Sequence, residues 1–88
     1  MPRVIITHDV VDLQRWLEGK AEREAALSAF GANVIDTVAL DGSNKIAVTA
    51  DINDLAALEA MLTSPPPELA AIMEKHGVIP PFTTFVEK

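Results

Sequence analysis

Hydrophobic and polar residues follow two periodicities along this chain, one typical of strands and one typical of helices. Residues 3–8 form a short β-branched run, and residues 33–40 and 45–52 form two more. Residues 41–44, Asp-Gly-Ser-Asn, have the composition of a turn, which predicts an antiparallel hairpin. Residues 82–86 follow two prolines and form a last β-rich run. The pattern therefore predicts four strands.

Apolar residues at helical spacing lie between these runs. Residues 13–30 carry one apolar stripe and are predicted as a single helix, which Asp9 or Asp12 can cap at its start. Gly19 lies inside this helix, where glycine costs about 1 kcal/mol relative to alanine, and only close packing explains its presence. Gly31 is expected to end the helix in the left-handed conformation.

The second helical region is interrupted. Asn53 or Asp54 suits the N-cap of a helix that continues to residue 63. Residues 64–67, Ser-Pro-Pro-Pro, break this helix and begin another, because proline is tolerated in the first turn. Gly77 is expected to end the second piece, again in the left-handed conformation.

The predicted order of elements is β-α-β-β-α-β, with the second helix broken. Right-handed crossovers on one antiparallel sheet turn this order into an α+β, ferredoxin-like fold with the strand order 4-1-3-2. The chain has 88 residues and is expected to form one domain over residues 1–88, because pieces below about 50 residues rarely hold a core unaided. Both helical regions should cover one face of the sheet and leave the other open.

The open face is expected to be apolar, because few charges fall on either face of the predicted strands. An apolar sheet face that is exposed to water has to be covered. We expect a homodimer in which two open faces pack together and enclose a small barrel. The interior would be an apolar pocket with a few polar groups, which suits a small apolar or aromatic ligand.

Composition excludes several classes of function. The formal net charge is −6 and no basic stripe is present, so neither nucleic acid nor an anionic membrane surface is an expected partner. The chain has no cysteine, which excludes disulfides and thiolate metal sites. No stretch approaches the roughly 20 apolar residues of a membrane span, and the start lacks a secretory signal. A cytoplasmic protein is expected.

Four segments carry a resemblance to a known family: residues 8–12 with Trp16 four residues on, residues 44–48, residues 54–58 and residues 64–78. Together they resemble a family of small uncharacterised dimeric α/β-barrel proteins that is similar to antibiotic-biosynthesis monooxygenases and polyketide cyclases. The resemblance covers nearly the whole chain. Its residues are mostly caps, turns and core positions, so it specifies the fold better than the chemistry.

The resemblance implies cofactor-independent oxygenation, cyclisation or isomerisation of a small aromatic or polyketide-like molecule. Oxygenases of this superfamily use a tryptophan or an asparagine beside the substrate, but the resemblance does not place that tryptophan at Trp16. Two alternatives remain open. One is a noncatalytic ligand-binding or assembly module of the same fold, because no convergent set of polar residues is visible. The other, weaker alternative is a regulatory ligand sensor. The sequence leaves open whether the protein is an enzyme.

His8 is the candidate catalytic residue. It ends the first predicted strand, where a strand edge meets the mouth of the cleft in barrels of this kind. An ordinary histidine pKa near 6.5 suits proton transfer at neutral pH. The alternative, which is the more ordinary one, is a structural histidine bonded to a backbone carbonyl or to Asp12.

Asp36 and Trp16 are the candidate ligand-binding residues. If a β-bulge lies at the hairpin turn, Asp36 is the one acid on the apolar face of the hairpin. Exposure near a strand edge is the alternative that we favour for Asp36. Trp16 lies on the apolar stripe of the first helix, where packing in the core is favoured over a place in a pocket wall.

His76 and Arg23 have ordinary explanations. His76 ends a helix, where its cation would be favoured by the helix dipole. Arg23 lies among glutamates and is interpreted as a solvated helix charge. His8 and His76 lie in distant elements without the spacing of paired ligands, so no metal site is expected.

Overall fold

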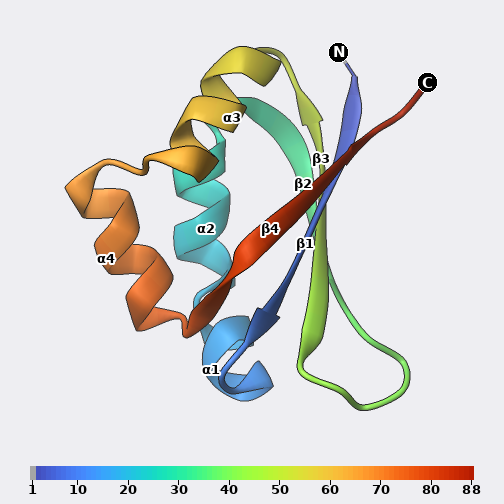
Figure 1. Ribbon diagram of the computed structural model, residues 1–88, viewed down its shortest axis with the longest axis vertical. Coiled ribbons are helices and arrows are strands. Elements are labelled where there is room, and N and C mark those ends of the chain that lie inside the picture. The colour runs from blue at the N-terminus through green and yellow to red at the C-terminus, as the bar shows by residue number, and fades with distance from the viewer. Residues whose placement is uncertain (1) are drawn as a thin grey trace.

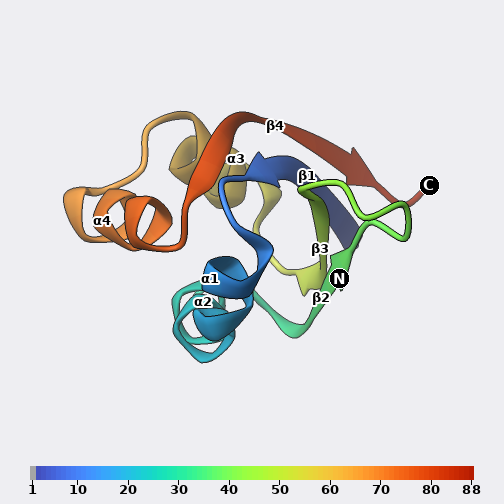
Figure 2. The same cartoon turned by 90° about the horizontal axis from the view of Figure 1, so that it is seen from below.

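The computed structural model describes residues 2–88. It contains a four-stranded antiparallel sheet with helices on one face (Figure 1). In chain order its elements are β1 (Arg3–Val10), α1 (Leu13–Glu18), α2 (Lys20–Leu27), β2 (Gly31–Val38), β3 (Lys45–Ile52), α3 (Leu55–Thr63), α4 (Pro67–Lys75) and β4 (Val78–Val86). The strand order is β2-β3-β1-β4. The predicted α+β, ferredoxin-like fold and its strand order are therefore confirmed. Figure 2 shows the helices to one side of the sheet, with α4 outermost.

Two of the predicted caps begin helices. The Asp12 carboxylate accepts hydrogen bonds from the amides of Gln14 and Arg15, at 2.9 and 3.3 Å, and so starts α1. The Asp54 carboxylate accepts one from the Ala57 amide at 3.0 Å and starts α3. Each cap satisfies amides that have no partner in the first helical turn.

The prediction of one helix over residues 13–30 is wrong, because the chain breaks into α1 and α2 at Gly19. A Cβ at Gly19 would overlap the imidazole ring of His76, which follows α4 and is only 2 % exposed. The glycine therefore lets His76 pack directly against the α1–α2 junction. The sequence suggests close packing at Gly19, and the structure shows that the packing residue is His76.

The expected role of Gly31 is also wrong. Gly31 is the first residue of β2, and a Cβ there would overlap the carbonyl oxygen of Asp51 on β3. Gly77, by contrast, has φ +73° and ends α4 as expected. The bulge in the hairpin lies between Ala32 and Ile35, at the start of β2 rather than at the turn.

The core lies between the helices and one face of the sheet. It is formed by alternate residues of β1 and β3 together with residues of the helices: Val4, Ile6, Val10, Trp16, Ile46, Val48, Ala50, Ile52, Leu58 and Met61. Because side chains alternate along a strand, the residues between these core positions point to the opposite face. Asp36 pairs with Val48 in the register, so it belongs to the helix-covered face.

The opposite face of the sheet has no covering element among the described residues. One row of side chains crosses all four strands: Ile35, Thr49, Ile5 and Phe85. Its three large members are 39 % (Ile5), 49 % (Ile35) and 54 % (Phe85) exposed. The next row is Thr37, Ala47, Thr7 and Thr83.

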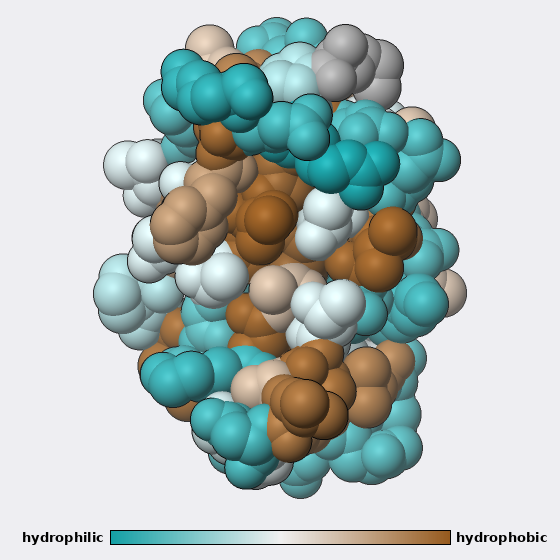
Figure 3. Space-filling model, turned by 90° about the vertical axis from the view of Figure 1, so that its right-hand side faces the viewer, coloured by the Kyte–Doolittle hydropathy of each residue, from teal (hydrophilic) through white to brown (hydrophobic). Residues whose placement is uncertain are grey.

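Charges on this open face are confined to its ends and are paired. Arg3 bonds Asp51 at 3.3 Å at one end, and Lys45 bonds Asp9 at 3.4 Å at the other. Figure 3, which views this face, shows apolar side chains in its middle and again toward its lower end, with hydrophilic ones mostly along the margins. The expectation of an open, largely uncharged face is confirmed.

The fit between Gly19 and His76 gives a first prediction. In an ordinary helix Gly→Ala stabilises by about 0.5–1 kcal/mol. Here we expect Gly19→Ala to lower the free energy of unfolding by about 1–3 kcal/mol, because the added methyl group overpacks a filled space. Urea denaturation measures the change, and adding His76→Ala should remove most of the methyl's cost. A neutral or stabilising Gly19→Ala would contradict the packing described.

Candidate functional site

His8 lies where the pairing of β1 with β4 is interrupted. The register passes from the Thr7–Thr83 pair to the Asp9–Ile79 pair, so one residue of β1 faces three residues of β4. Two of those three are prolines, which have no amide hydrogen to donate to a neighbouring strand. His8 therefore occupies a local opening between two strands.

The His8 ring is directed to the helix-covered side, as is the side chain of Ile6 two residues earlier. It makes edge contacts with the rings of Phe82 and Trp16, with centroids 5.2 and 6.4 Å away. Two of the three predicted site residues, His8 and Trp16, are therefore neighbours.

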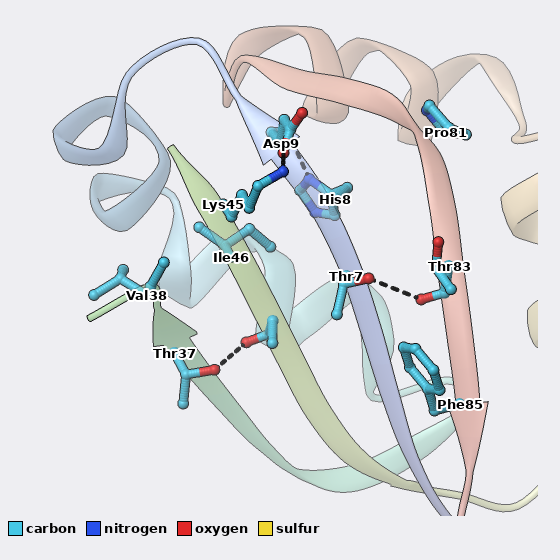
Figure 4. Close-up of a pocket in the computed structure, with 12 residues that line it drawn as sticks. Thr7, His8, Asp9, Thr37, Val38, Lys45, Ile46, Pro81, Thr83 and Phe85 are labelled. Carbon is cyan, nitrogen blue, oxygen red and sulfur yellow. Dashed lines mark hydrogen bonds and ion pairs between the residues drawn. The ribbon is translucent and has the colours of Figure 1, made fainter. Parts of the chain in front are cut away.

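Two hollows meet at His8, one on each side of the sheet. The hollow on the open face has a volume of about 520 Å³, and Figure 4 shows threonines, Phe85 and the Lys45–Asp9 pair around it. The cavity under the helices is smaller, about 70 Å³. Its walls are apolar side chains of β1, β3, α2, α3, α4 and β4, and its polar members are His8, Arg23 and His76.

Hydrogen bonding fixes the tautomer of His8. Its Nδ1 lies 2.9 Å from the Asp9 carbonyl oxygen, which can only accept, so Nδ1 carries the hydrogen. The Nε2 atom makes no hydrogen bond within residues 2–88, and in the half-buried neutral ring it is an acceptor that solvent can still reach. Burial lowers the pKa of His8, as does the charge of Arg23, while the Asp9 carbonyl and carboxylate oppose the change. The ring is therefore a neutral base at pH 7.

Arg23 is the centre of a buried polar cluster. Its guanidinium carbon lies 4.0 Å from the centroid of the Trp16 ring, its Nη1 donates to the Trp16 carbonyl, and its Nη2 donates to Asp36 Oδ2 at 3.2 Å. The Arg23 and Asp36 side chains are 11 % and 2 % exposed. The favoured interpretations, a solvated Arg23 and an exposed Asp36, are both wrong, because each residue is the other's buried counter-ion.

His76 connects this cluster to Glu22. Arg23 Nη1 lies 3.3 Å from His76 Nδ1 and can only donate, so Nδ1 accepts and Nε2 donates to Glu22 Oε1 at 2.8 Å. Burial lowers the pKa of His76, and the Arg23 charge acts in the same direction, although the bond to Glu22 opposes it. The explanation of His76 as a cation on a helix dipole is therefore wrong, since the buried ring is held neutral.

Three buried polar atoms of the cluster have no hydrogen-bond partner within the described chain: Trp16 Nε1, Arg23 Nε and Asp36 Oδ1. Two of them are donors and one is an acceptor. Such atoms are rare in folded proteins, because each forfeits the hydrogen bond that it makes with water in the unfolded chain.

The structure connects His8, Trp16 and Asp36 in one cluster through Arg23. Of the three, only His8 lines the cavity under the helices. Arg23 and His76 also belong to this cluster, and the sequence does not predict that they do. No periodicity links Arg23 on α2 with Asp36 on β2. The only signal was the unexplained Gly19, which marks the contact with His76. Within residues 2–88 no cluster of three or more potential metal ligands occurs, and no helix there has the length and hydropathy to cross a membrane.

The fold and this site define a ferredoxin-like α+β protein with an apolar, helix-covered cavity. No family model and no curated protein matches the sequence. Solved structures do match the fold. A protein of Agrobacterium tumefaciens aligns with TM-score 0.68 at 15 % identity and covers 100 % of this chain and 92 % of its own.

Two further solved structures carry functional names. An antibiotic biosynthesis monooxygenase aligns with TM-score 0.62 at 13 % identity, over 100 % of this chain and 97 % of its own. A candidate antibiotic biosynthesis monooxygenase from Deinococcus radiodurans aligns with TM-score 0.58 at 12 % identity, over 97 % and 90 %. The chain therefore has the fold of these proteins, and at such identities the likeness concerns the fold alone.

The neutral histidines predict how stability depends on pH. His8 and His76 are the two histidines of the chain, and both have a folded-state pKa below the unfolded value near 6.5. The unfolded state then binds more protons, so the free energy of unfolding should fall as the pH drops below about 6.5. The slope should be at most about 1.4 kcal/mol per pH unit for each histidine.

Urea denaturation at pH 7.5, 6.5 and 5.5 tests this dependence. The double variant His8→Gln with His76→Gln should lose most of the slope, because glutamine does not titrate. A wild-type protein that becomes more stable as the pH falls through this range would show that the rings are protonated in the folded state.

Proposed function

We propose that this protein is a cofactor-independent oxygenase of the monooxygenase or cyclase type, with His8 as its general base, acting on a small phenolic or enolisable ring compound. The observation that supports it most directly is a neutral histidine that lines an apolar cavity and whose Nε2 makes no hydrogen bond within the described chain. The fold that it shares with proteins named antibiotic biosynthesis monooxygenases adds support.

The chemistry needs only a base and a site that excludes water. His8 takes the hydroxyl proton, and the resulting anion is electron-rich enough to reduce O₂ and form a peroxide anion at a ring carbon. His8 returns its proton to this peroxide and gives the hydroperoxide. The hydroperoxide then loses water, made from its distal hydroxyl group and the hydrogen of the same ring carbon, and leaves a carbonyl. For hydroquinone the balance is one hydroquinone and one O₂ giving one hydroxybenzoquinone and one water.

The cavity volume favours a single ring over a fused polyketide. A cavity of about 150 Å³ accepts benzene in a well-studied case. The cavity here is about 70 Å³, so even one ring needs the side chains around it to move outward. The element best placed to move is α4, which lies outermost among the helices (Figure 2) and supplies Leu69, Ile72 and Met73 to the cavity wall.

A noncatalytic binding or assembly module is the second candidate. Two observations favour it: the small cavity, and the bond from His8 to a backbone carbonyl, which a structural histidine also makes. Oxygen consumption separates the two functions, because a binding module takes up no O₂.

The test of His8 uses hydroquinone as the probe. We expect protein-dependent O₂ uptake in an oxygen electrode and formation of hydroxybenzoquinone in its visible spectrum. His8→Gln should reduce the rate by about 100-fold or more, the usual contribution of a general base. Gln14→Ala, at an exposed position on α1, serves as the matched control and should keep the wild-type rate. Equal rates in His8→Gln and wild type would exclude His8 as the base.

We further propose that the open sheet face pairs with the same face of a second copy. The exposed row of Ile5, Ile35 and Phe85 is self-complementary in its apolar character, and the charges at its ends are already paired within the chain. An apolar row that is exposed to water favours association with other proteins. A twofold contact between two such sheets would remove the row from water.

Sedimentation at micromolar concentration tests the pairing. We expect the wild type to be a dimer and Phe85→Lys to be a folded monomer, because a lysine in the middle of the face would have to be buried without a partner. Leu17→Lys, on α1 and 41 % exposed, is the matched control and should remain a dimer. A monomeric wild type would contradict the proposal.

A further inference from the structure

Arg23 lines the helix-covered cavity together with His8, and its hydrogen bonding is incomplete. Nη1 donates to the Trp16 carbonyl and to His76, and Nη2 donates to Asp36. The Nε hydrogen has no acceptor among the described residues, although it is buried. A charged donor in this position is a ready partner for an oxygen atom of a bound molecule.

The charges around Arg23 limit which oxygen can bind there. From β2 the Asp36 carboxylate neutralises the guanidinium, and Asp36 Oδ1 is itself without a partner. On the α4 side His76 is neutral and bonded to Glu22, whose other oxygen lies 3.6 Å from Lys75 Nζ. The described cluster thus offers no uncompensated positive charge to hold a permanent anion.

A neutral hydroxyl group fits these constraints better than a carboxylate does. It enters without the cost of removing an ion from water. Once inside, its proton can pass to His8 Nε2, so that the resulting oxyanion has the imidazolium of His8 as its counter-ion and accepts a hydrogen bond from Arg23 Nε. His8 and Arg23 line the same cavity, and both contact the Trp16 ring. The pair of a neutral base and a cation therefore favours a group that ionises in place.

We propose that Arg23 is the oxyanion-binding residue of this cavity and determines its specificity for molecules with an acidic hydroxyl group, phenols or enols. The assignment rests on the proposed site, and it adds the group that holds the ionised oxygen. Trp16, whose ring stacks on the guanidinium, and Asp36 position Arg23.

The probe for this assignment is 4-nitrophenol, which absorbs visible light only as the phenolate. Titrating the protein into 4-nitrophenol, at a pH where the free probe is mostly neutral, should produce the phenolate band. We expect bound probe to be enriched in phenolate by about tenfold or more, which corresponds to a shift of one pKa unit or more from a nearby opposite charge.

Two variants separate the role of Arg23 in binding the oxyanion from its role in folding. Asp36→Asn removes the competing anion and should increase the phenolate band. Arg23→Met combined with Asp36→Asn removes both charges together, so that neither is left buried alone, and should abolish the band. Circular dichroism and urea denaturation establish that the double variant is folded.

The outcomes are distinct from those of the oxygen-uptake test. A phenolate band without O₂ uptake would support the Arg23 assignment and contradict the oxygenase. The assignment is overturned if the wild type gives no band with millimolar 4-nitrophenol, or if the folded double variant gives the same band as Asp36→Asn.

Discussion

The buried contact of the Arg23 guanidinium with the Trp16 ring and the Asp36 carboxylate is the interaction on which the rest of the site depends. It joins the two pieces of the first helical region to β2, and through His76 it reaches the end of α4. Removing two charges from water costs about as much as their attraction returns, so such a pair adds little net stability. The effect of the Arg23–Asp36 pair is to fix how α2 packs against β2. Any other packing would leave one of the two ions buried without its partner, which is costly.

Each face of the sheet has its own proposed role: the helix-covered face holds the ligand cavity, and the open face forms the dimer contact. Alternation along β1 sends Ile6 and His8 toward the helices and Ile5 and Thr7 toward the open face. The opening in the β1–β4 pairing lets His8 line hollows on both sides. A dimer formed through the open face would therefore change the surroundings of His8 without occupying the cavity under the helices.

The sequence predicts four strands and their order, and it limits the two caps to Asp9 or Asp12 and to Asn53 or Asp54. Each of these features depends on residues that are neighbours in the chain or on general rules of connection. It fails where the partner is distant. The single predicted helix breaks at Gly19 because the His76 ring occupies the space of a side chain there. The sequence favours exposure for both Asp36 and Arg23, since nothing in either local sequence shows that the other is present. It indicates His8, Trp16 and Asp36 as individual residues, whereas their connection through Arg23 follows only from the fold.

The proposed chemistry requires that His8 is a neutral base whose Nε2 can accept a proton in the cavity that Arg23 also lines. Two-dimensional ¹H–¹⁵N NMR of the histidine side chains, followed from pH 8 to pH 5, tests it without any substrate. We expect His8 to be the Nδ1–H tautomer at pH 7, because Nδ1 donates to Asp9, and its pKa to lie below 6.5. A His8 ring that is protonated at pH 7, or one that carries its hydrogen on Nε2, would exclude His8 as the base.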